Sequence, residues 1–221
     1  DLSKLPDLDK IAAIFIETYQ GWGALQYPKK YLKSLYKIAK KHNALFCVDE
    51  IQSGFYRMGK LFGYMTYGNF KPDIVCLGKG LTSSLPLSAV LSTDEIINLD
   101  PTANLSSTHA GNAVCCAAAL ANLEFLTEKN FQKELSKKIK VFEKRSKSLE
   151  RYKNVKCVNT KGMVTGIIMD NILRTDKIVE YCVLNGVLPV WTKRESIKLG
   201  PPLTITIDAI NETFDVIEQG I

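Results

Sequence analysis

The chain has 221 residues, of which 46% are hydrophobic, and a formal net charge of +6 at pH 7; this is enough for a buried core and excludes a disordered chain. No apolar stretch approaches the roughly 20 residues of a membrane helix and no secretion signal is present, so we expect a cytoplasmic protein without a membrane partner. The six cysteines show no CxxC spacing, which favours neither a zinc site nor a disulfide framework.

Strands and helices are expected to alternate through the first part of the chain. The predicted strands are residues 11–16, 44–48, 73–77 and 87–92, and the predicted helices are residues 28–42 and 111–126. These strands are short, largely apolar runs, and residues 11–16 are also rich in β-branched residues, whereas the helices show apolar positions at helical spacing or many small residues. This alternation is typical of an α/β sheet that is covered on both faces.

The positive charge is concentrated in one later element. Residues 128–156 contain eleven Lys or Arg against four Glu, a local excess of +7. Apolar residues recur at helical spacing through this element; they are Phe131, Leu135, Ile139, Phe142 and Leu149. The pattern predicts an amphipathic helix with a solvated basic face. We expect no nucleic-acid partner, because no aromatic residues or base-reading motif are interleaved with the lysines.

Charged residues follow three of the predicted strands at the point where each strand ends. The first strand ends at Glu17, the second at Asp49 and Glu50, and the third runs into CLGKGL, which holds Lys79 between two glycines. Ligands of parallel sheets bind beyond the carboxyl ends of the strands. Because a charge at such a position is costly unless it is paired, we expect a ligand that contacts both an acid and a lysine.

Two ligand chemistries fit this arrangement. An apolar strand running into Asp49 and Glu50 resembles the magnesium-binding Walker B strand, but the chain contains no GxxxxGK[ST] phosphate loop. Pyridoxal phosphate needs a lysine amine for its aldehyde, an anion beside its ring nitrogen and donors for its phosphate. Lys79 and Asp49 supply the first two groups, so this cofactor is the favoured interpretation and a nucleotide site is the alternative.

Five segments, in their order and spacing, resemble the class III aminotransferases, the pyridoxal-phosphate enzymes that include ornithine, acetylornithine and 4-aminobutyrate transaminases. The segments are ETYQGWG, FCVDEIQSGFYRMGKLFGY, KPDIVCLGKGL, LPLSAVL and SSTHAGNAVCCAAALANLEFL. The resemblance runs from about residue 11 to residue 217. It includes KGMVTGIIM, similar to a small-domain strand of the family, and IKLGPPLTIT, similar to its C-terminal strand.

The resemblance implies an α/β chain with the fold type I of pyridoxal-phosphate transferases, in which the large domain has a mostly parallel sheet. Residues 1–127 would be part of that cofactor-binding domain, and residues 128–221 a connecting helix and a small α+β C-terminal domain. The upstream half of the family, with its phosphate loop and the aromatic residue that stacks on the cofactor, has no counterpart in this chain. We therefore expect the rear part of a longer protein, inactive by itself.

The resemblance also implies roles for individual residues. Lys79 corresponds to the Schiff-base lysine, Asp49 to the partner of the pyridine nitrogen and Gln52 to the residue that bonds the ring hydroxyl. Thr108 corresponds to a threonine that contacts the cofactor phosphate of the neighbouring subunit, which implies a homodimer with shared active sites. Glu17 corresponds to a glutamate on the substrate side. Structural interpretations stay open, such as a helix cap for Thr108 or a solvated strand end for Glu17.

Two positions depart from the family pattern. Lys198 stands where many relatives carry an arginine that grips the substrate carboxylate, and lysine lacks the planar fork that makes two parallel bonds. Trp22 stands where a small or acidic residue is usual. We expect both residues on the substrate side, together with Tyr19, and a substrate without an α-carboxylate at Lys198. Core packing is the open alternative for Trp22 and Tyr19.

We therefore predict a transaminase that moves an amino group between an amine or amino acid and a keto acid or aldehyde by a ping-pong mechanism. Lys79 is expected in a dry, enclosed site, where its free amine removes the proton from the substrate carbon. The alternatives are an aminomutase or racemase on the same fold, or a scaffold without catalytic activity.

Overall fold

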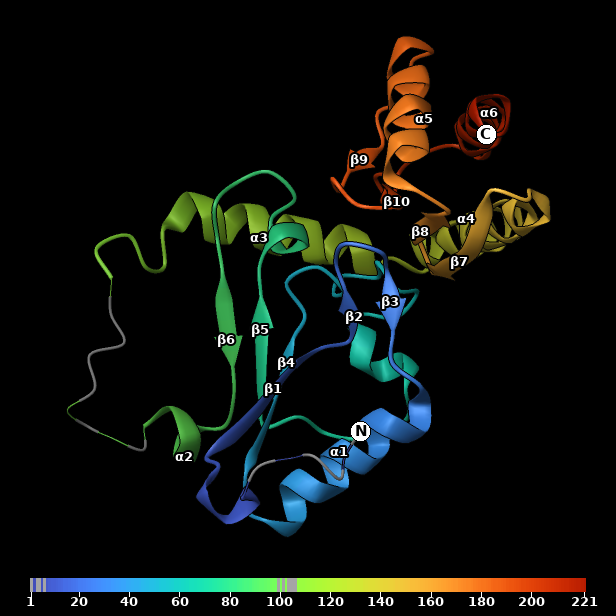
Figure 1. The fold of residues 1–221 in the computed structure, drawn as a ribbon. Helices are drawn as coiled ribbons and strands as arrows, with labels where there is room; N and C mark the ends of the chain where they lie inside the picture. The colour runs from blue at the N-terminus through green and yellow to red at the C-terminus, as the bar shows by residue number, and fades with distance from the viewer. Residues whose placement is uncertain (1, 3–4, 6, 99, 101, 103–106) are drawn as a thin grey trace. The chain divides into compact units, whose positions relative to one another are not determined.

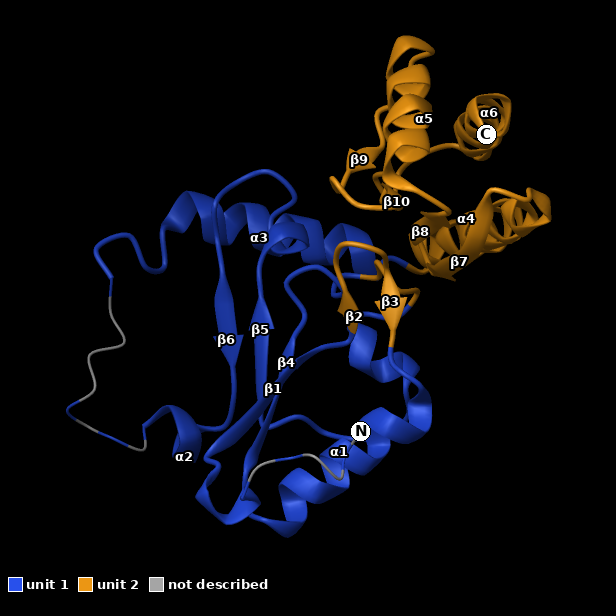
Figure 2. Cartoon of the chain, in the orientation of Figure 1, with its two compact units in different colours: residues 1–18, 27–55, 60–128 blue, residues 19–26, 56–59, 129–221 orange. Residues whose placement is uncertain are grey.

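The computed structural model describes residues 2, 5, 7–98, 100, 102 and 107–221. The chain divides into two compact units (Figure 2). Unit 1 consists of Asp1–Thr18, Tyr27–Phe55 and Lys60–Glu128, and unit 2 consists of Tyr19–Gln26, Tyr56–Gly59 and Lys129–Ile221. Two short segments from the first half of the chain thus fold with the second half. None of the described helices is long and apolar enough to cross a bilayer.

Unit 1 is built on a four-stranded sheet with the order β1-β4-β5-β6 (Figure 1). Its elements are β1 (Ala13–Glu17), α1 (Lys29–Lys41), β4 (Leu45–Asp49), β5 (Ile74–Leu77), β6 (Ala89–Leu91), α2 (Asp94–Ile97), α3 (Ala113–Thr127) and the 3-10 helices η2 (Leu8–Lys10), η3 (Gly63–Thr66) and η4 (Lys79–Leu81). β1, β4 and β5 are parallel, and β6 is antiparallel to β5. The predicted strands and helices are thus confirmed, with small shifts at their ends.

The core of unit 1 lies between α1 and the centre of the sheet. α1 buries Leu32, Leu35 and Ala39, which recur at helical spacing, and the side chains of Phe46 and Val48 in β4 are fully buried. The outer strands are less covered than the sequence predicted. Phe15 in β1 is 64% exposed, because alternate residues of a strand face opposite sides and its neighbours take the buried side.

Unit 2 is an α+β unit whose antiparallel sheet has the order β7-β8-β10-β9. Its elements are β2 (Tyr19–Gln20), β3 (Leu25–Gln26), α4 (Lys129–Ser148), the 3-10 helix η5 (Leu149–Arg151), β7 (Val155–Lys161), β8 (Val164–Met169), α5 (Ile172–Leu184), β9 (Val190–Trp191), β10 (Ser196–Leu199) and α6 (Ile207–Gly220). β2 and β3 pair as a small hairpin.

The hairpin segment packs directly on the sheet of unit 2. A Cβ atom on Gly166 in β8 would lie 2.1 Å from the Gly23 carbonyl oxygen, so only glycine permits this approach. The Asn159 side chain donates to the same carbonyl at 3.0 Å. Residues 56–59 join unit 2 in a similar way, because Arg57 donates to the carbonyls of Met163 (2.8 Å) and Pro201 (2.6 Å).

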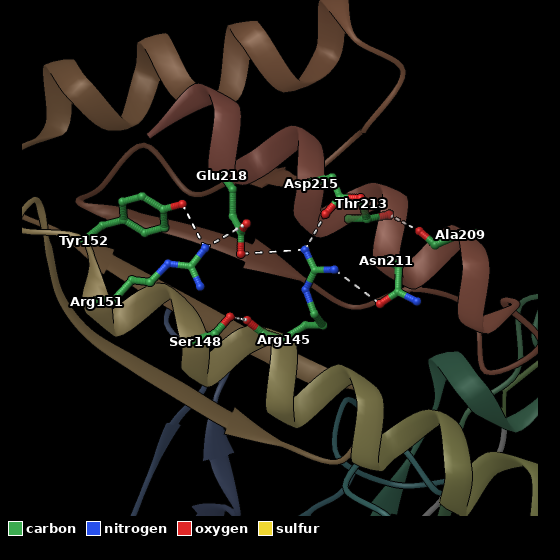
Figure 3. A network of polar contacts seen from close by, with 9 residues as sticks. All are labelled: Arg145, Ser148, Arg151, Tyr152, Ala209, Asn211, Thr213, Asp215 and Glu218. Atoms are coloured by element: carbon green, nitrogen blue, oxygen red, sulfur yellow. Dashed lines mark hydrogen bonds and ion pairs between the residues drawn. The ribbon is translucent and has the colours of Figure 1, made fainter.

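α4 is the amphipathic helix that the charge pattern predicted. It buries Phe131, Leu135 and Phe142 and leaves most of its lysines exposed. On a further face, Arg145 bonds Asp215 of α6 at 2.6 Å, and Arg151 of η5 bonds Glu218 at 3.0 Å (Figure 3). These ion pairs fix α6 against the end of α4.

Candidate functional site

The ends of β1, β4 and β5 carry charged residues at one edge of the unit 1 sheet. The parallel register pairs Glu17 with Asp49, and Asp49 with Cys76. Lys79 follows Cys76 by three residues and begins η4. The structure therefore places Glu17, Asp49 and Lys79 at the carboxyl edge of three adjacent strands, where parallel sheets bind their ligands.

The Asp49 carboxylate is held in place from one side only. Its Oδ1 accepts a hydrogen bond from the backbone N–H of Ile51 at 2.9 Å, and the side chain is half-buried. Burial and the charge of Asp49 together raise the pKa of the Cys76 thiol. No described residue bonds Oδ2, so this oxygen is free to accept a proton donor such as a protonated ring nitrogen.

Lys79 has a backbone conformation that is rare for residues with side chains. Its φ angle of 42° lies in the left-handed region. α3 supports this turn, because the Asn122 side chain donates to the carbonyls of Gly80 (2.8 Å) and Leu81 (3.1 Å). Strained conformations that their surroundings enforce are common at functional sites. The residue pattern alone does not reveal this backbone conformation.

The side chain of Lys79 is exposed in unit 1, and the enclosed site expected for it in the full-length protein stays a prediction. A turn at the end of a strand presents its side chain outward, and the described residues of unit 1 do not cover it. The amine is thus accessible to a ligand at the sheet edge.

Glu50 has a different place from the one that the sequence suggested. Its side chain is fully buried and points away from the edge that Asp49 occupies, since consecutive residues of an extended chain face opposite sides. It accepts hydrogen bonds from four donors, which are the N–H groups of Gly63 (2.6 Å) and Tyr64 (2.8 Å) and the hydroxyls of Ser53 (2.7 Å) and Thr18 (3.4 Å). Glu50 therefore fixes the loop that carries the half-buried Gln52.

Thr108 and His109 lie in the exposed turn before α3. The N-terminal cap of α3 is Asn112, whose Oδ1 accepts from Val114 N (3.0 Å) and Cys115 N (3.2 Å). The structural interpretation of Thr108 as the helix cap is therefore wrong, and its hydroxyl lies at the surface of unit 1.

The remaining candidates form a separate group in unit 2. Lys198 of β10 is only 6% exposed, and its Nζ lies 5.9 Å from the centroid of the Tyr19 ring. Trp22 is half-buried, and the guanidinium carbon of Arg194 lies 4.9 Å from its ring centroid. The structure thus brings Tyr19, Trp22 and Lys198 to one side of the unit 2 sheet. Arg194 was not among the sequence candidates, because its proximity to Trp22 depends on the turn between β9 and β10.

The donor set of unit 1 fits pyridoxal phosphate in its chemistry. An accessible primary amine and an anchored carboxylate with one free oxygen follow adjacent strands, as the aldehyde and the ring nitrogen of that cofactor require. The exposed hydroxyl of Thr108 is a suitable phosphate donor.

Known proteins resemble this chain over almost its whole length. The acetylornithine aminotransferase of Caldanaerobacter subterraneus subsp. tengcongensis is 32% identical over 96% of this chain and 53% of its own length. The leucine/methionine racemase of Thermococcus litoralis is 33% identical over 96% of this chain and 50% of its own length. The chain spans about half the length of the curated relatives that it matches.

Solved structures share the fold. The ornithine aminotransferase of Plasmodium yoelii matches with a TM-score of 0.87 and 31% identity, over 96% of this chain and 58% of that one. The predicted fold type I of pyridoxal-phosphate transferases is thereby confirmed. The family profile described as aminotransferase class-III matches residues 3–221. Both sheets and the edge that carries Asp49 and Lys79 lie within that match, and the chain belongs to the class III aminotransferases, a pyridoxal-phosphate-dependent family.

Proposed function

We propose that the full-length protein is a transaminase that uses pyridoxal 5'-phosphate to move an amino group between an amine or amino acid and a keto acid or aldehyde. The observation that carries this proposal is the position of Asp49 and Lys79 beyond adjacent parallel strands. When bound, the cofactor supplies an electron sink for the charge that develops on the substrate carbon.

Each residue has a defined task in this proposal. Lys79 would hold the cofactor aldehyde through its Nζ, and its free amine would take the proton from the substrate carbon. Asp49 keeps a proton on the ring nitrogen through its free Oδ2. Gln52 bonds the ring hydroxyl, and Glu17 lies on the substrate side of the same edge.

We further propose a cytoplasmic homodimer in which Thr108 binds the phosphate of the partner subunit. α3 supports an assembly surface, because its residues are mostly apolar and these apolar residues are not confined to one side of the helix. In unit 1 this helix nevertheless leaves Val114 68% and Leu120 59% exposed. Apolar surface of this kind marks interaction sites.

The cofactor assignment is tested on the complete protein with pyridoxal phosphate. We expect a visible absorption band of the bound cofactor, and borohydride reduction should attach the cofactor covalently to Lys79. Lys79→Ala should lose both signals, whereas Lys71→Ala, at an exposed lysine before β5, should keep them. Absence of the band from the parent protein would contradict the proposal.

A racemase is the second candidate, because the Thermococcus litoralis relative has that name. Incubation of the holoenzyme with one enantiomer of an amino acid and a keto acid separates the two reactions. A transaminase consumes the keto acid and forms a new amino acid. A racemase inverts the first amino acid and leaves the keto acid unchanged, and that result would replace our proposal.

A further inference from the structure

The mostly apolar helix α3 carries one amide side chain, that of Asn122. Asparagine is a poor helix former, because its short polar side chain competes for backbone hydrogen bonds. In α3 this side chain bonds a distant segment instead. Its amide nitrogen donates to the carbonyls of Gly80 at 2.8 Å and Leu81 at 3.1 Å, which are 42 and 41 residues away in the chain. Both acceptors belong to η4, the turn that begins with Lys79.

The hydrogen bonds between α3 and η4 require an amide. The last carbonyl groups of a helical turn have no donors within the turn itself. A primary amide nitrogen carries two hydrogens, so one asparagine supplies a donor to both carbonyls. Aspartate and leucine have nearly the same size as asparagine, but aspartate offers only acceptors in its ionised form and leucine has no polar group.

The other side of the η4 turn packs on the loop after β4. A Cβ atom on Gly80 would lie 3.3 Å from the Phe55 side chain, and a Cβ atom on Gly78 would lie 3.4 Å from the Ile51 side chain. Ile51 is also the residue whose backbone N–H bonds Asp49 Oδ1 at 2.9 Å. The turn is therefore held between α3 and the loop that anchors the Asp49 carboxylate.

The backbone of Lys79 depends on such support. Its φ angle of 42° lies in the left-handed region, which residues with a Cβ atom rarely adopt. Conformations of this kind persist only where the surrounding structure enforces them. A rotation about the N–Cα bond of Lys79 would change the direction in which its exposed side chain leaves the turn. The bonds from Asn122 to the next two residues oppose this rotation.

We propose that Asn122 is a positioning residue, which fixes the left-handed backbone of Lys79 and so keeps its amine within reach of the cofactor aldehyde. Lys79 Nζ condenses with that aldehyde, forming a carbon–nitrogen double bond and releasing one water, and this bond requires the amine in one place. The inference rests on the proposed transaminase function. It adds to the site a residue that lies outside the carboxyl edge of the sheet.

The first experiment measures binding without turnover. The complete protein, freed of cofactor, is titrated in a calorimeter with pyridoxal 5'-phosphate and, separately, with pyridoxamine 5'-phosphate. Only the first compound has the aldehyde that bonds Lys79, so only its Kd depends on the position of the amine. Asn122→Leu should raise the Kd of pyridoxal phosphate about tenfold, as expected for the loss of two hydrogen bonds. The Kd of pyridoxamine phosphate should change by less than about twofold.

Two further variants separate the hydrogen bonds from packing and from general destabilisation. Asn122→Asp keeps the size of the side chain and places acceptors beside two carbonyls, so it should raise the Kd of pyridoxal phosphate at least as much as Asn122→Leu. In a Lys79→Ala background, Asn122→Leu should have no additional effect on either Kd, because no amine remains to be positioned.

Asn185 offers a matched control in unit 2. Its amide nitrogen also donates to a backbone carbonyl, that of Tyr181 at 2.8 Å, at the end of α5. Asn185→Leu removes a hydrogen bond of the same kind without touching η4. It should leave the Kd of both cofactor forms within about twofold of the parent values.

The second experiment tests the free amine as a base. In Asn122→Leu, the rate at which saturating alanine converts the pyridoxal form of the cofactor into the pyridoxamine form should fall about tenfold or more. In Lys79→Ala with added methylamine as the base, Asn122→Leu should leave this rate unchanged, because methylamine is not attached to the turn.

Equal weakening of both cofactor forms by Asn122→Leu, or an undiminished effect in the Lys79→Ala background, would overturn the inference. The visible cofactor band separates this failure from failure of the proposed function. If the parent protein shows the band while Asn122→Leu and Asn122→Asp leave both Kd values unchanged, the transaminase assignment stands and the role of Asn122 is wrong. If the parent protein shows no band, the proposed function itself is wrong.

Discussion

The Glu50 carboxylate holds the loop after β4 because two backbone N–H groups, of Gly63 and Tyr64, depend on it. Glu50→Ala would leave the buried Gly63 N–H and the part-buried Tyr64 N–H without an acceptor, at a cost of about 1–3 kcal/mol for a fully buried group. We expect the free energy of unfolding, from urea titration, to fall by at least about 2 kcal/mol. Glu180→Ala, at an exposed position of α5, should change the free energy of unfolding by less than about 0.5 kcal/mol. Similar losses in both variants would contradict the role of Glu50 in holding this loop.

Tyr67 makes stability depend on pH in the alkaline range. Its hydroxyl donates to the Thr18 carbonyl at 2.5 Å, and burial raises its pKa from 10.0 to about 12. Folding thus favours the neutral phenol, so this contribution is complete below the unfolded pKa of about 10 and is lost as the pH rises through about 12. The free energy of unfolding should fall more steeply over this range in the parent protein than in Tyr67→Phe. Parallel pH profiles would show that Tyr67 does not titrate as described.

The orientation and backbone conformation of single residues could not be predicted from the sequence. The acids at the end of β4 are adjacent in the chain, and the pattern alone did not separate Asp49, which faces the sheet edge, from Glu50, which faces the interior. The left-handed conformation of Lys79 and its support by Asn122 are set by packing between η4 and α3. Such contacts between segments distant in the chain leave no periodic signal.

At the scale of elements, hydrophobic periodicity was enough to predict the long, regular helices and the central strands. α1 and α4 have apolar residues at helical spacing, and β4 and β5 are short apolar runs with polar ends. The hairpin of β2 and β3 could not be assigned to unit 2 in this way. Its position depends on a close approach between Gly23 and Gly166, two glycines far apart in the chain.

The lysines of α4 repel one another along the exposed face of the helix. Lys137, Lys140 and Lys144 are three and four residues apart, and such like-charged neighbours destabilise a helix by a few tenths of a kcal/mol per pair. Lys140→Glu should replace these two repulsions with two attractions, while its pair with Glu143, three residues on, changes from an attraction to a repulsion, so the free energy of unfolding should rise by about 0.5 kcal/mol. The gain should shrink in concentrated salt. Lys140→Gln should show about half of this gain in the free energy of unfolding. A loss of stability in Lys140→Glu would show that the lysines of α4 do not repel one another as described.

At the scale of the whole molecule, α3 carries exposed apolar side chains that unit 1 does not cover. A mostly apolar helix whose apolar residues are spread around it is expected in an interior, yet Val114, Cys116, Leu120 and Phe125 are exposed. The chain spans about half the length of its curated relatives, and we propose that the complete homodimer covers this helix. The cysteines of the chain provide a test, because they sample exposed and buried positions in both units.

In the native 221-residue chain, a thiol reagent should modify Cys116 and Cys157 rapidly, since both are exposed. Cys47 and Cys182 should react only on unfolding, because they are buried and their pKa values are raised to about 11 by burial, which keeps both thiols protonated near neutral pH. In the complete protein, Cys116 on α3 should become protected while Cys157 on β7 stays reactive. Mass spectrometry of the labelled peptides measures each site separately. Equal reactivity of Cys116 in the chain and in the complete protein would place the assembly surface elsewhere than on α3.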